Sequence, residues 1–435
     1  MKRLTIGGAL ALAAALLVSA VAASTSSSSP KRQSATKVVI WLQNDAKNGW
    51  EQMVTSTNDA FKAKHPGVEV DVQYQGWGDH LTKFDAALAG GTAPDVIEFG
   101  NTETTRYMAG RLLQDLTAQT KSFPNSKTWL GALKDSCTYR GKLYCVPYYA
   151  GARAVIYRKD QYKAAGVKGT PKSLAQFQAA GRKLMKKYGA QRNYSALYFP
   201  GQYWYAAMSF VYDYGGKIAE FKSGKWKGTL TSPQAIKGLT QMKATVRALS
   251  RASKTTDEAN PQQALVFSKG RVGSFIGNGW EWPYALDEKV GDPSLKNKMS
   301  AYPMPSHVAG KYMPTFLGGS DVAVPVTSKN KALAYDWIRI FTSASSMRKI
   351  ATIGKQIPNT TTLASVNAGN PQLAPFTNAS KYSWFVPTAP NWVKVENARV
   401  LKNLVQAIVT GRQSVAKAAK SASDQITKIL NQPVT

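Results

Sequence analysis

The sequence predicts an α/β fold with mostly parallel sheets, distributed over more than one domain. The chain has 435 residues, which is more than a single hydrophobic core usually organises. Its hydrophobic content of 43% is typical of a globular protein rather than of a membrane protein with many spans. Between residues 37 and 99, predicted strands alternate with predicted helices, as in βαβ units built on a parallel sheet.

The first of these elements are defined by apolar runs and by the residues that end them. An apolar run or an alternating pattern indicates a strand, and apolar residues at helical spacing indicate a helix. His65-Pro66-Gly67 and Gly90-Gly91 end the two helices. The predicted strands cover residues 37–42, 68–74 and 94–99, and the predicted helices cover residues 49–64 and 81–89.

Three loops follow these strands, and in open α/β sheets ligands bind beyond the carboxyl ends of the strands. All three loops carry polar or aromatic side chains. The candidate ligand-binding residues in them are Asn44, Asp45, Trp77, Asp79, Asn101 and Glu103. For Asn101 and Glu103 an alternative stays open, since a buried polar side chain can bond a loop amide instead of a ligand.

The chain has two cysteines, Cys137 and Cys145, placed symmetrically about Arg140-Gly141-Lys142. This pattern predicts a β-hairpin, and in an oxidising compartment a disulfide across it. No metal site is expected. The three histidines are far apart in the sequence and none is near a cysteine: His65, His80 and His307.

The same α/β pattern continues to the C-terminus. An extended segment is expected over residues 146–157, and further strands over residues 272–276, 298–305 and 316–325. Ser232-Pro233 is typical of a helix start. The other helices are expected over residues 171–188, around Tyr203-Trp204-Tyr205, and over residues 259–267, 332–341, 391–410 and 414–430.

One stretch, residues 268–284, combines a strand, a turn and several aromatic rings. After the strand come Gly277-Asn278-Gly279, which allow positive φ, and then Trp280, Trp282 and Tyr284 with Glu281 among them. Aromatic faces bind the apolar C–H face of a sugar, while a carboxylate accepts hydrogen bonds from its hydroxyls. The alternative is that these rings only pack the end of a sheet.

The N-terminus predicts export. Lys2-Arg3 precedes an apolar run over residues 6–21 and a small-residue cleavage site, so residues 1–23 are expected to be a signal peptide. The Ser-rich residues 24–36 are expected to be a flexible tether. The cleavage region resembles a bacterial lipoprotein signal, but Ser24 stands where the lipid-bearing cysteine would be. We therefore expect an extracellular or cell-surface protein without a direct lipid anchor.

The chain is strongly basic, with 56 Lys and Arg against 25 Asp and Glu. Removal of Lys2 and Arg3 with the signal peptide lowers the formal net charge from +31 to +29. Such a charge favours contact with an anionic cell envelope. Nucleic acid is not expected as a partner, because the basic residues are scattered, no nucleic-acid-binding motif is present, and the chain is exported.

Four groups of motifs occur in one order along most of the mature chain. They are Leu88-Ala-Gly-Gly-Thr-Ala-Pro-Asp-Val96, then Tyr139-Arg-Gly-Lys-Leu-Tyr-Cys-Val-Pro-Tyr148 with Val155-Ile-Tyr-Arg-Lys-Asp160, then Phe267-Ser-Lys-Gly270 with Gly277-Asn-Gly-Trp-Glu-Trp282, and Gly411-Arg-Gln-Ser-Val415 with Ile426-Thr-Lys428. In this order and spacing they resemble the extracellular solute-binding proteins of ABC importers, in the carbohydrate-binding cluster that includes maltose-binding protein.

The resemblance implies a periplasmic-binding-protein-like fold of two lobes, each a mostly parallel sheet flanked by helices, joined by hinge strands. The N-lobe is expected to comprise residues 37–148 with about 303–344, and the C-lobe residues 149–302 with about 345–435. The chain would cross between the lobes near residues 148–151, 301–305 and 342–346. Closure of the lobes over a ligand by hinge motion is the implied behaviour.

The resemblance also implies a second set of ligand-binding residues. They are Tyr149, Trp204, Trp280, Glu281, Gly319, Trp384 and Trp392, and Trp280 matches the stacking tryptophan of the family. The implied ligand is a sugar or oligosaccharide, and the implied partner is the transmembrane permease of an ABC transporter. We expect a monomer without a cofactor.

Two other classes of protein compete with this interpretation. A secreted glycoside hydrolase needs two carboxylates across an aromatic groove, which Asp45, Asp79, Glu103 or Glu281 could supply. Binding proteins use the same carboxylates to accept hydrogen bonds, and neither Gly-x-Ser-x-Gly nor His-Glu-x-x-His occurs in the chain. We therefore predict that the chain is not an enzyme. A cell-wall-binding protein would suit the charge, but the βαβ order and the family motifs argue against it.

Overall fold

The structure is a computed structural model that describes residues 36–433. The predicted signal peptide and all of the predicted tether except Thr36 lie outside these residues. Thr36 itself is the first residue of a strand. Within the described part of the chain, no helix combines the length and the apolar character needed to cross a bilayer.

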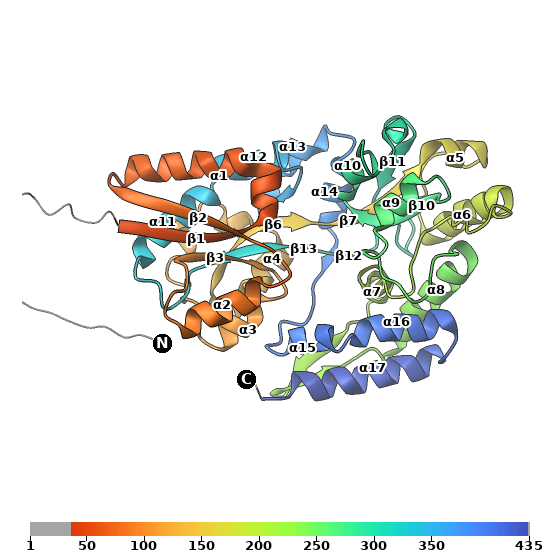
Figure 1. The fold of residues 1–435 in the computed structure, drawn as a ribbon. Coiled ribbons are helices and arrows are strands. Elements are labelled where there is room, and N and C mark those ends of the chain that lie inside the picture. The colour runs from red at the N-terminus through yellow and green to blue at the C-terminus, as the bar shows by residue number, and fades with distance from the viewer. Residues whose placement is uncertain (1–35, 434–435) are drawn as a thin grey trace, which may run out of the picture. The chain divides into compact units, whose positions relative to one another are not determined.

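The first lobe is built on a six-stranded sheet with the order β14-β6-β13-β3-β1-β2 (Figure 1). Its strands are β1 (Thr36–Gln43), β2 (Val68–Gln75), β3 (Val96–Gly100), β6 (Cys145–Gly151), β13 (Gly318–Ala323) and β14 (Ile357–Pro358). Strand β1 pairs in parallel with both β2 and β3, which confirms the predicted βαβ start. The pairs of β13 with β3 and β6, and of β14 with β6, are antiparallel.

Helices cover both faces of this sheet. In Figure 1, α1 (Asn44–Lys64) and α12 (Ala344–Thr352) lie above the sheet, and α2 (His80–Ala89) and α3 (Thr104–Ala109) lie below it. Alternate residues of β1, namely Val38, Ile40 and Leu42, are fully buried in the core between these layers. This inward alternation fixes the register of β1.

The second lobe is built on a three-stranded sheet, β10-β7-β11, with β7 (Arg153–Arg158), β10 (Ser274–Asn278) and β11 (Met299–Tyr302). Both strand pairs are antiparallel, and three of the five neighbouring pairs in the first-lobe sheet are antiparallel as well, so the prediction of mostly parallel sheets is wrong for both lobes. The physical reason is the path of the chain. β7 carries the chain away from the first lobe, and β10 and β11 both run in the opposite direction beside it.

The core of the second lobe is mainly helical and aromatic. It lies among α6 (Leu174–Tyr188), α7 (Trp204–Asp213), α8 (Pro233–Leu249), α16 (Val400–Thr410) and α17 (Val415–Leu430). The Ser232 hydroxyl accepts a hydrogen bond from the Ala235 N–H, as the predicted N-cap requires. The helix predicted over 391–410 is two helices, because Arg399 adopts a left-handed conformation (φ 55°) between α15 (Trp392–Asn397) and α16.

The remaining elements are short or peripheral. The helices are α4 (Gly131–Ser136), α5 (Lys159–Ala164), α9 (Gln263–Ser268), α10 (Glu281–Ala285), α11 (Lys331–Phe341), α13 (Ala364–Ala368) and α14 (Ala374–Ser380), with 3₁₀ turns at Thr120–Ser122, Ser126–Thr128, Pro293–Leu295 and Thr361–Leu363. The strands are β4 (Thr138–Tyr139), β5 (Lys142–Leu143), β8 (Ala219–Lys222), β9 (Lys225–Gly228), β12 (Thr315–Phe316) and β15 (Ser383–Trp384).

The chain passes between the two sheets at places that differ in part from the expected ones. The first passage is between β6 and β7, next to the expected residues 148–151. Met304, Met313 and Phe316 still pack in the core of the second lobe, so the second passage lies between β12 and β13 rather than near 301–305. Residues 344–363 pack with the first lobe, which places the third passage after Leu363 rather than near 342–346.

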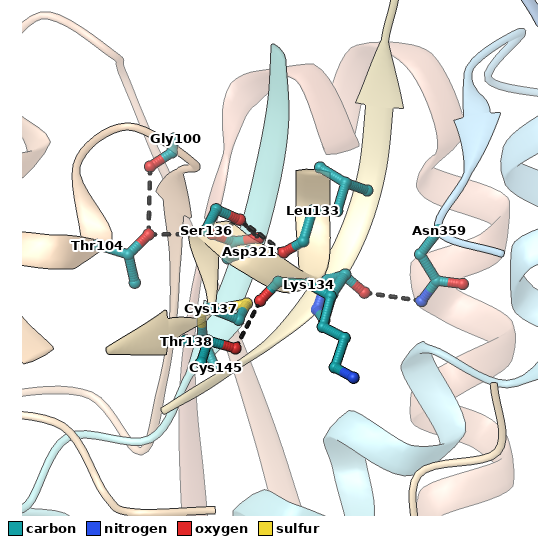
Figure 2. The surroundings of a disulfide bond; sticks show 11 residues. Gly100, Thr104, Leu133, Lys134, Ser136, Cys137, Thr138, Cys145, Asp321 and Asn359 are labelled. Carbon is teal, nitrogen blue, oxygen red and sulfur yellow. Dashed lines mark hydrogen bonds between the residues drawn. A yellow bond between two sulfur atoms is a disulfide. The ribbon is translucent and has the colours of Figure 1, made fainter. Parts of the chain in front are cut away.

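The predicted disulfide hairpin is present in the first lobe (Figure 2). Cys137 and Cys145 are bonded, and β4 and β5 pair between them with Arg140 and Gly141 as the two-residue turn. Both turn residues have positive φ, 49° and 77°, which is the requirement of the tightest hairpin turns. The disulfide thus ties the start of β6 to α4 and confirms the prediction from the cysteine spacing.

Candidate binding site

The first three strands end at one edge of the six-stranded sheet, so the segments after them lie together. β1 and β2 are parallel and in register up to Gln43 opposite Gln75. The segment after β1 is not a loop, because α1 begins at Asn44, directly after the strand. The prediction of a loop over 43–45 with a helix from 49 is therefore wrong, and Asp45 belongs to the first turn of α1.

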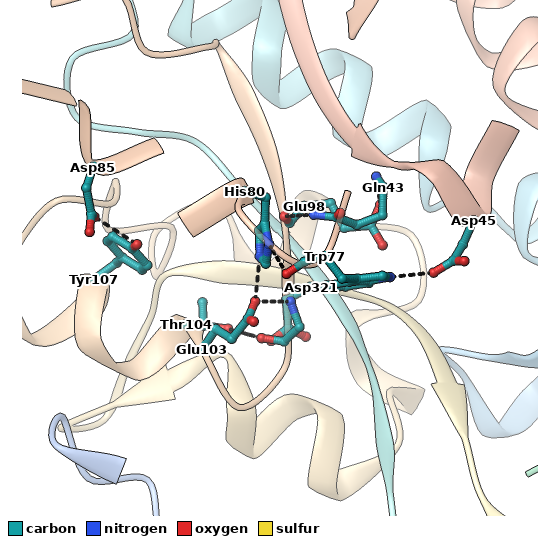
Figure 3. Close-up of polar contacts among 11 residues, drawn as sticks. Gln43, Asp45, Trp77, His80, Asp85, Glu98, Glu103, Thr104, Tyr107 and Asp321 are labelled. Atoms are coloured by element: carbon teal, nitrogen blue, oxygen red, sulfur yellow. Dashed lines mark hydrogen bonds and ion pairs between the residues drawn. The ribbon is translucent and has the colours of Figure 1, made fainter. Parts of the chain in front are cut away.

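Trp77, in the loop after β2, lies at the centre of this edge. Its ring is 40% exposed, although three neighbours hold it in place. Its indole N–H donates to Asp45 Oδ2 at 2.6 Å, and the ring of His80 meets it edge-on with 5.2 Å between ring centroids (Figure 3). The third neighbour is Gly100, where an added Cβ would lie 3.4 Å from Trp77 Cζ3.

Glu103, in the segment after β3, joins this group through His80. Its Oε2 lies 2.9 Å from His80 Nε2 and accepts the Gly100 N–H at 2.8 Å. The other ring nitrogen of His80, Nδ1, lies 3.1 Å from the carbonyl oxygen of Trp77. We call Asp45, Trp77, His80 and Glu103 the first-lobe cluster.

His80 is a site residue that the sequence analysis missed. The available signal was its position, at the first residue of a helix and three residues after an exposed tryptophan. The side chain is 2% exposed, and it connects two of the three segments that the sheet edge brings together.

Two buried carboxyl groups lie behind the cluster. Glu98, in the centre of β3, accepts the Gln43 N–H at 2.8 Å, and burial raises its pKa to about 7. Asp321, in β13, accepts hydrogen bonds from the hydroxyls of Ser136 and Thr104, and burial raises its pKa to about 8 despite these donors. A carboxyl group inside an apolar strand was the sequence signal for Glu98.

The other candidates from the first lobe have different surroundings. The Asn101 side chain is buried and donates to the Leu317 carbonyl at 3.0 Å, while its backbone N–H donates to the carbonyl of Gly319. Gly319 has φ 146°, and a Cβ there would lie 2.0 Å from the carbonyl oxygen of Tyr149. Asn101 and Gly319 therefore hold the second passage between the lobes against the end of β3.

Three further candidates border this region without joining the cluster. Asn44 is exposed, and Asp79 is exposed and paired with Lys83 one turn along α2. Tyr149, in β6, is half-buried, and its ring packs against Trp50 with 5.2 Å between the centroids.

On the second lobe, a group of aromatic rings faces the Glu103 segment. Trp204, Tyr205 and Trp392 line a cavity of about 320 Å³ together with Thr102 and Glu103 from the first lobe. Trp204 and Tyr205 are stacked with 4.0 Å between their centroids, and Trp392 lies 6.3 Å from Trp204. The structure thus brings predicted residues from both lobes to one cavity.

Tyr205 and Glu396 line this cavity and were not among the predicted residues. Arg153, at the start of β7, lies under the Tyr205 ring, with its guanidinium carbon 4.4 Å from the centroid, and donates from Nε to the Tyr203 hydroxyl. Burial raises the pKa of Glu396 to about 7. Glu396 lies four residues after Trp392 in α15, and this helical spacing was the signal that could have identified it.

Trp384 belongs to the same core as Trp204 and Trp392, which are themselves 4% and 1% exposed, but unlike them it does not line the cavity. It is 3% exposed, stacks on Tyr212 with 4.8 Å between the centroids, and donates its indole N–H to the Ser209 hydroxyl.

Trp280 is separated from this cavity and lies on the turn after β10. It is 44% exposed, and Tyr284 is its nearest ring, with 6.4 Å between the centroids. Glu281 points the other way: it is 2% exposed and accepts the Asn278 N–H at 2.6 Å and the Gln263 amide at 3.2 Å. Burial raises the pKa of Glu281 to about 7. Its contacts close the turn that presents Trp280.

One group of side chains has metal-ligand spacing, namely Cys137, Cys145 and Asp321, whose ligand atoms lie within 4.8 Å of one another. Both sulfur atoms belong to the disulfide, so neither is a thiolate that could bind a metal ion.

Comparison with known proteins decides between these possibilities. The family model for the bacterial extracellular solute-binding proteins matches residues 34–348. The chain belongs to this family. It is a solute-binding protein, and membership in a family of binding proteins confirms the prediction that it is not an enzyme.

A curated relative supports this assignment, and two solved structures support the fold. The diacetylchitobiose-binding protein DasA of Streptomyces coelicolor is 32% identical over 373 residues, which cover 86% of this chain and 85% of DasA. The GacH receptor of Streptomyces glaucescens has a TM-score of 0.74 at 21% identity, covering 92% of this chain and 99% of GacH. The sugar-binding protein MalE of Xanthomonas citri has a TM-score of 0.76 at 19% identity, covering 91% and 97%. These two structures confirm the two-lobed α/β fold.

Proposed function

We propose that this solute-binding protein captures a sugar or short oligosaccharide between its lobes and delivers it to the permease of an ABC transporter. The observation that carries the proposal is the first-lobe cluster, in which an exposed indole ring lies beside two carboxylates. An aromatic face for C–H groups and carboxylates for hydroxyl groups are complementary to a sugar. DasA, named for binding a disaccharide, supports this choice of ligand class.

The proposed site combines side chains from both lobes. Trp77, Asp45 and Glu103 form one side, and Trp204, Tyr205 and Trp392 form the other side of the cavity that Glu103 lines. Trp280 adds a fifth ring, at the N-cap position of α10. Trp384, Glu281, Asn101 and Gly319 support these residues from behind and are not proposed to touch the ligand.

Closure is proposed to occur by movement about the three passages between the sheets. Small residues lie near these passages, among them Gly151, Ala152 and Gly318. We propose residues 36–151, with about 318–363, as the first lobe and the remainder as the second. Only the closed, loaded form would dock productively on the permease.

The remaining features of the proposal concern location and partners. Export through the N-terminal signal peptide fits a family of extracellular proteins. With Ser24 in place of the lipid-bearing cysteine, retention by the anionic envelope through the net charge of +29 is the proposed alternative to an anchor. The protein is proposed to act as a monomer.

A thermal-shift screen of the mature protein tests the proposal. The ligand panel contains diacetylchitobiose, maltose, maltotetraose, monosaccharides, a peptide mixture and polyamines. A ligand at 100 times its Kd stabilises the folded state by about 2.7 kcal/mol, which a melting curve resolves. We expect a shift with at least one sugar and none with peptides or polyamines. A shift produced only by peptides or polyamines contradicts the sugar proposal, and consumption of the sugar would return the glycoside hydrolase alternative.

A further inference from the structure

The His80 ring has an acceptor at each of its two nitrogens. Nδ1 lies 3.1 Å from the backbone carbonyl oxygen of Trp77, which can only accept a hydrogen bond. Nε2 lies 2.9 Å from Glu103 Oε2. The side chain is 2% exposed, so water does not supply alternative partners to the ring (Figure 3).

A second contact of Glu103 Oε2 helps to show which protonation state of His80 fits the geometry. The same oxygen accepts the Gly100 N–H at 2.8 Å, so it has a donor on two sides. A neutral imidazole carries one N–H and would leave one of its two nitrogens facing an oxygen without a proton between them. The imidazolium form, with a proton on each nitrogen, satisfies both acceptors and places a cation against the Glu103 carboxylate.

The charged groups around the ring favour the same state. Burial disfavours the imidazolium, but the Glu103 hydrogen bond and charge, the Trp77 carbonyl and the charge of Glu98 outweigh it and raise the pKa of His80. Two other carboxyl groups lie in this region. Asp321 in β13 lies behind the first-lobe cluster, and Asp45 in α1 belongs to it. Lys83, a cation on the same helix α2, is paired with Asp79.

We propose that His80 is a positioning residue whose added proton holds Trp77 and Glu103 in the geometry that binds the ligand. The imidazolium connects the loop after β2 to the segment after β3, and its ring edge limits the movement of the Trp77 indole. Loss of the proton breaks one of the two hydrogen bonds, and both ligand-facing side chains lose a support. The link to ligand affinity rests on the proposed function, but the link to Trp77 does not.

The direction of the pH effect follows from the charge that the fold stabilises. Because the pKa of His80 in the folded protein is raised above 6.5, its contribution is complete below pH 6.5. The contribution is lost as the pH rises through the folded-state pKa. Ligand affinity is therefore expected to be higher at pH 6 than at pH 9.

NMR of the ligand-free protein tests the protonation state directly, because the chain has only three histidines. Imidazole ¹⁵N spectra are recorded from pH 5 to 10, and His80→Gln assigns the His80 signals. We expect both His80 nitrogens to be protonated at pH 6 and the midpoint of the His80 titration to lie above 6.5. His307, whose Nδ1 bonds Asp213 at the surface, serves as the internal reference. A His80 ring that is neutral at pH 6, or whose midpoint lies below 6.5, would overturn the proposal.

The positioning role has its own readout in the same samples. The indole N–H signal of Trp77, assigned with Trp77→Phe, should titrate with the midpoint of His80 in the wild type and should lose this titration in His80→Gln. His307→Gln is the matched control and should leave the Trp77 titration unchanged. A Trp77 signal that ignores the His80 titration overturns the proposal even when no ligand is available.

Affinity for diacetylchitobiose, measured by calorimetry from pH 6 to pH 9, connects the proton to binding. One charge-assisted hydrogen bond corresponds to about a tenfold change in Kd. The wild-type Kd should rise about tenfold over this range, and that of His80→Gln should stay within about twofold of the wild-type value at pH 9. A wild-type Kd that does not change with pH, with diacetylchitobiose bound, overturns the coupling. Absence of binding by the wild type at every pH contradicts the choice of this sugar, and the two NMR titrations then decide the role of His80.

Discussion

Trp77 in the first lobe and Trp280 in the second are similar in exposure and different in support. Both follow a strand and expose a large part of the ring, 40% and 44%. Trp77 is held by a hydrogen bond to Asp45, by the edge of His80 and by Gly100. Trp280 has one ring neighbour, Tyr284, and no hydrogen bond to its indole among the described residues.

The difference extends from these two residues to the lobes that carry them. In the first lobe, ionisable side chains orient the ring, so its position depends on charge and on protonation. In the second lobe, Trp204, Tyr205, Trp384 and Trp392 orient one another through ring contacts of 4.0 to 6.3 Å. Charged and polar contacts therefore orient the exposed ring of the first lobe, whereas packing against other rings holds the buried tryptophans of the second.

The largest expected effect is a difference in stability between variants of a core tryptophan, Trp384, and of an exposed one, Trp280. Trp384→Ala removes a core ring that stacks on Tyr212, and such a cavity should lower the free energy of unfolding by about 3–5 kcal/mol. Trp280→Ala removes a ring that is 44% exposed and should cost less than about 1 kcal/mol. Urea unfolding followed by circular dichroism measures both variants. Equal losses would show that Trp280 is also a core residue.

The second prediction concerns the pH dependence of stability, to which the buried carboxyl group of Asp321 contributes. Burial raises the pKa of Asp321 from 3.8 to about 8, so the folded state binds a proton that the unfolded state releases. The contribution to stability is complete below pH 4 and is lost as the pH rises towards 8, with about 1.4 kcal/mol for each pH unit between the two pKa values. Asp321→Asn should make the decline in the melting temperature from pH 4 to 9 less steep, and the part that remains belongs to Glu98, Glu281 and Glu396.

Asp336 is the control of opposite sign in the same lobe. Burial opposes its ionisation, but Lys64, Arg339 and His65 lower its pKa below 3.8. Asp336→Asn should therefore reduce stability above pH 4, and the difference from the wild type should vanish in acid. If both variants gave the same pH profile, the profile would report the net charge of the protein and not these two sites.

The sequence was informative where a local pattern determines the structure. The alternation in residues 68–74, the glycine turn between the cysteines, and Ser232-Pro233 each specify an element without help from distant residues. The passages between the lobes were misplaced because the local sequence of residues 303–317 and 344–363 does not show which of the two cores they join. Their assignment depends on long-range packing, which a single sequence does not encode locally.

The candidate site could be predicted by location but not by role. Glu103 and Glu281 are both carboxylates at turns, yet Glu103 lines a cavity and Glu281 is buried beneath the turn that presents Trp280. His80 was missed because a single histidine at a helix start has no motif. Its importance comes from two acceptors, one of which is 23 residues away in the sequence.

Affinity for the sugar should distinguish Trp77 and Trp280 from other exposed aromatic residues. Burying an aromatic side chain against a ligand contributes about 1.5–3 kcal/mol, so Trp77→Ala and Trp280→Ala should each raise the Kd for the bound sugar by about 10- to 100-fold. Tyr382→Ala, which removes a ring that is 47% exposed, is the control and should leave the Kd unchanged. Calorimetry gives all three values. A normal Kd for Trp280→Ala would restrict the site to the cavity beside Glu103.

The smallest expected effect tests the charged support of Trp77. Asp45→Asn keeps an oxygen that can accept the indole N–H but removes the charge, which should weaken this hydrogen bond by about 1 kcal/mol and raise the Kd about fivefold. Asp79→Asn is the matched control, because Asp79 pairs only with Lys83 on the surface. An equal change in both variants would mean that the general negative charge of this edge attracts the ligand. A change in Asp45→Asn alone would mean that the orientation of one indole ring determines the affinity, which is the property that distinguishes the first lobe from the second.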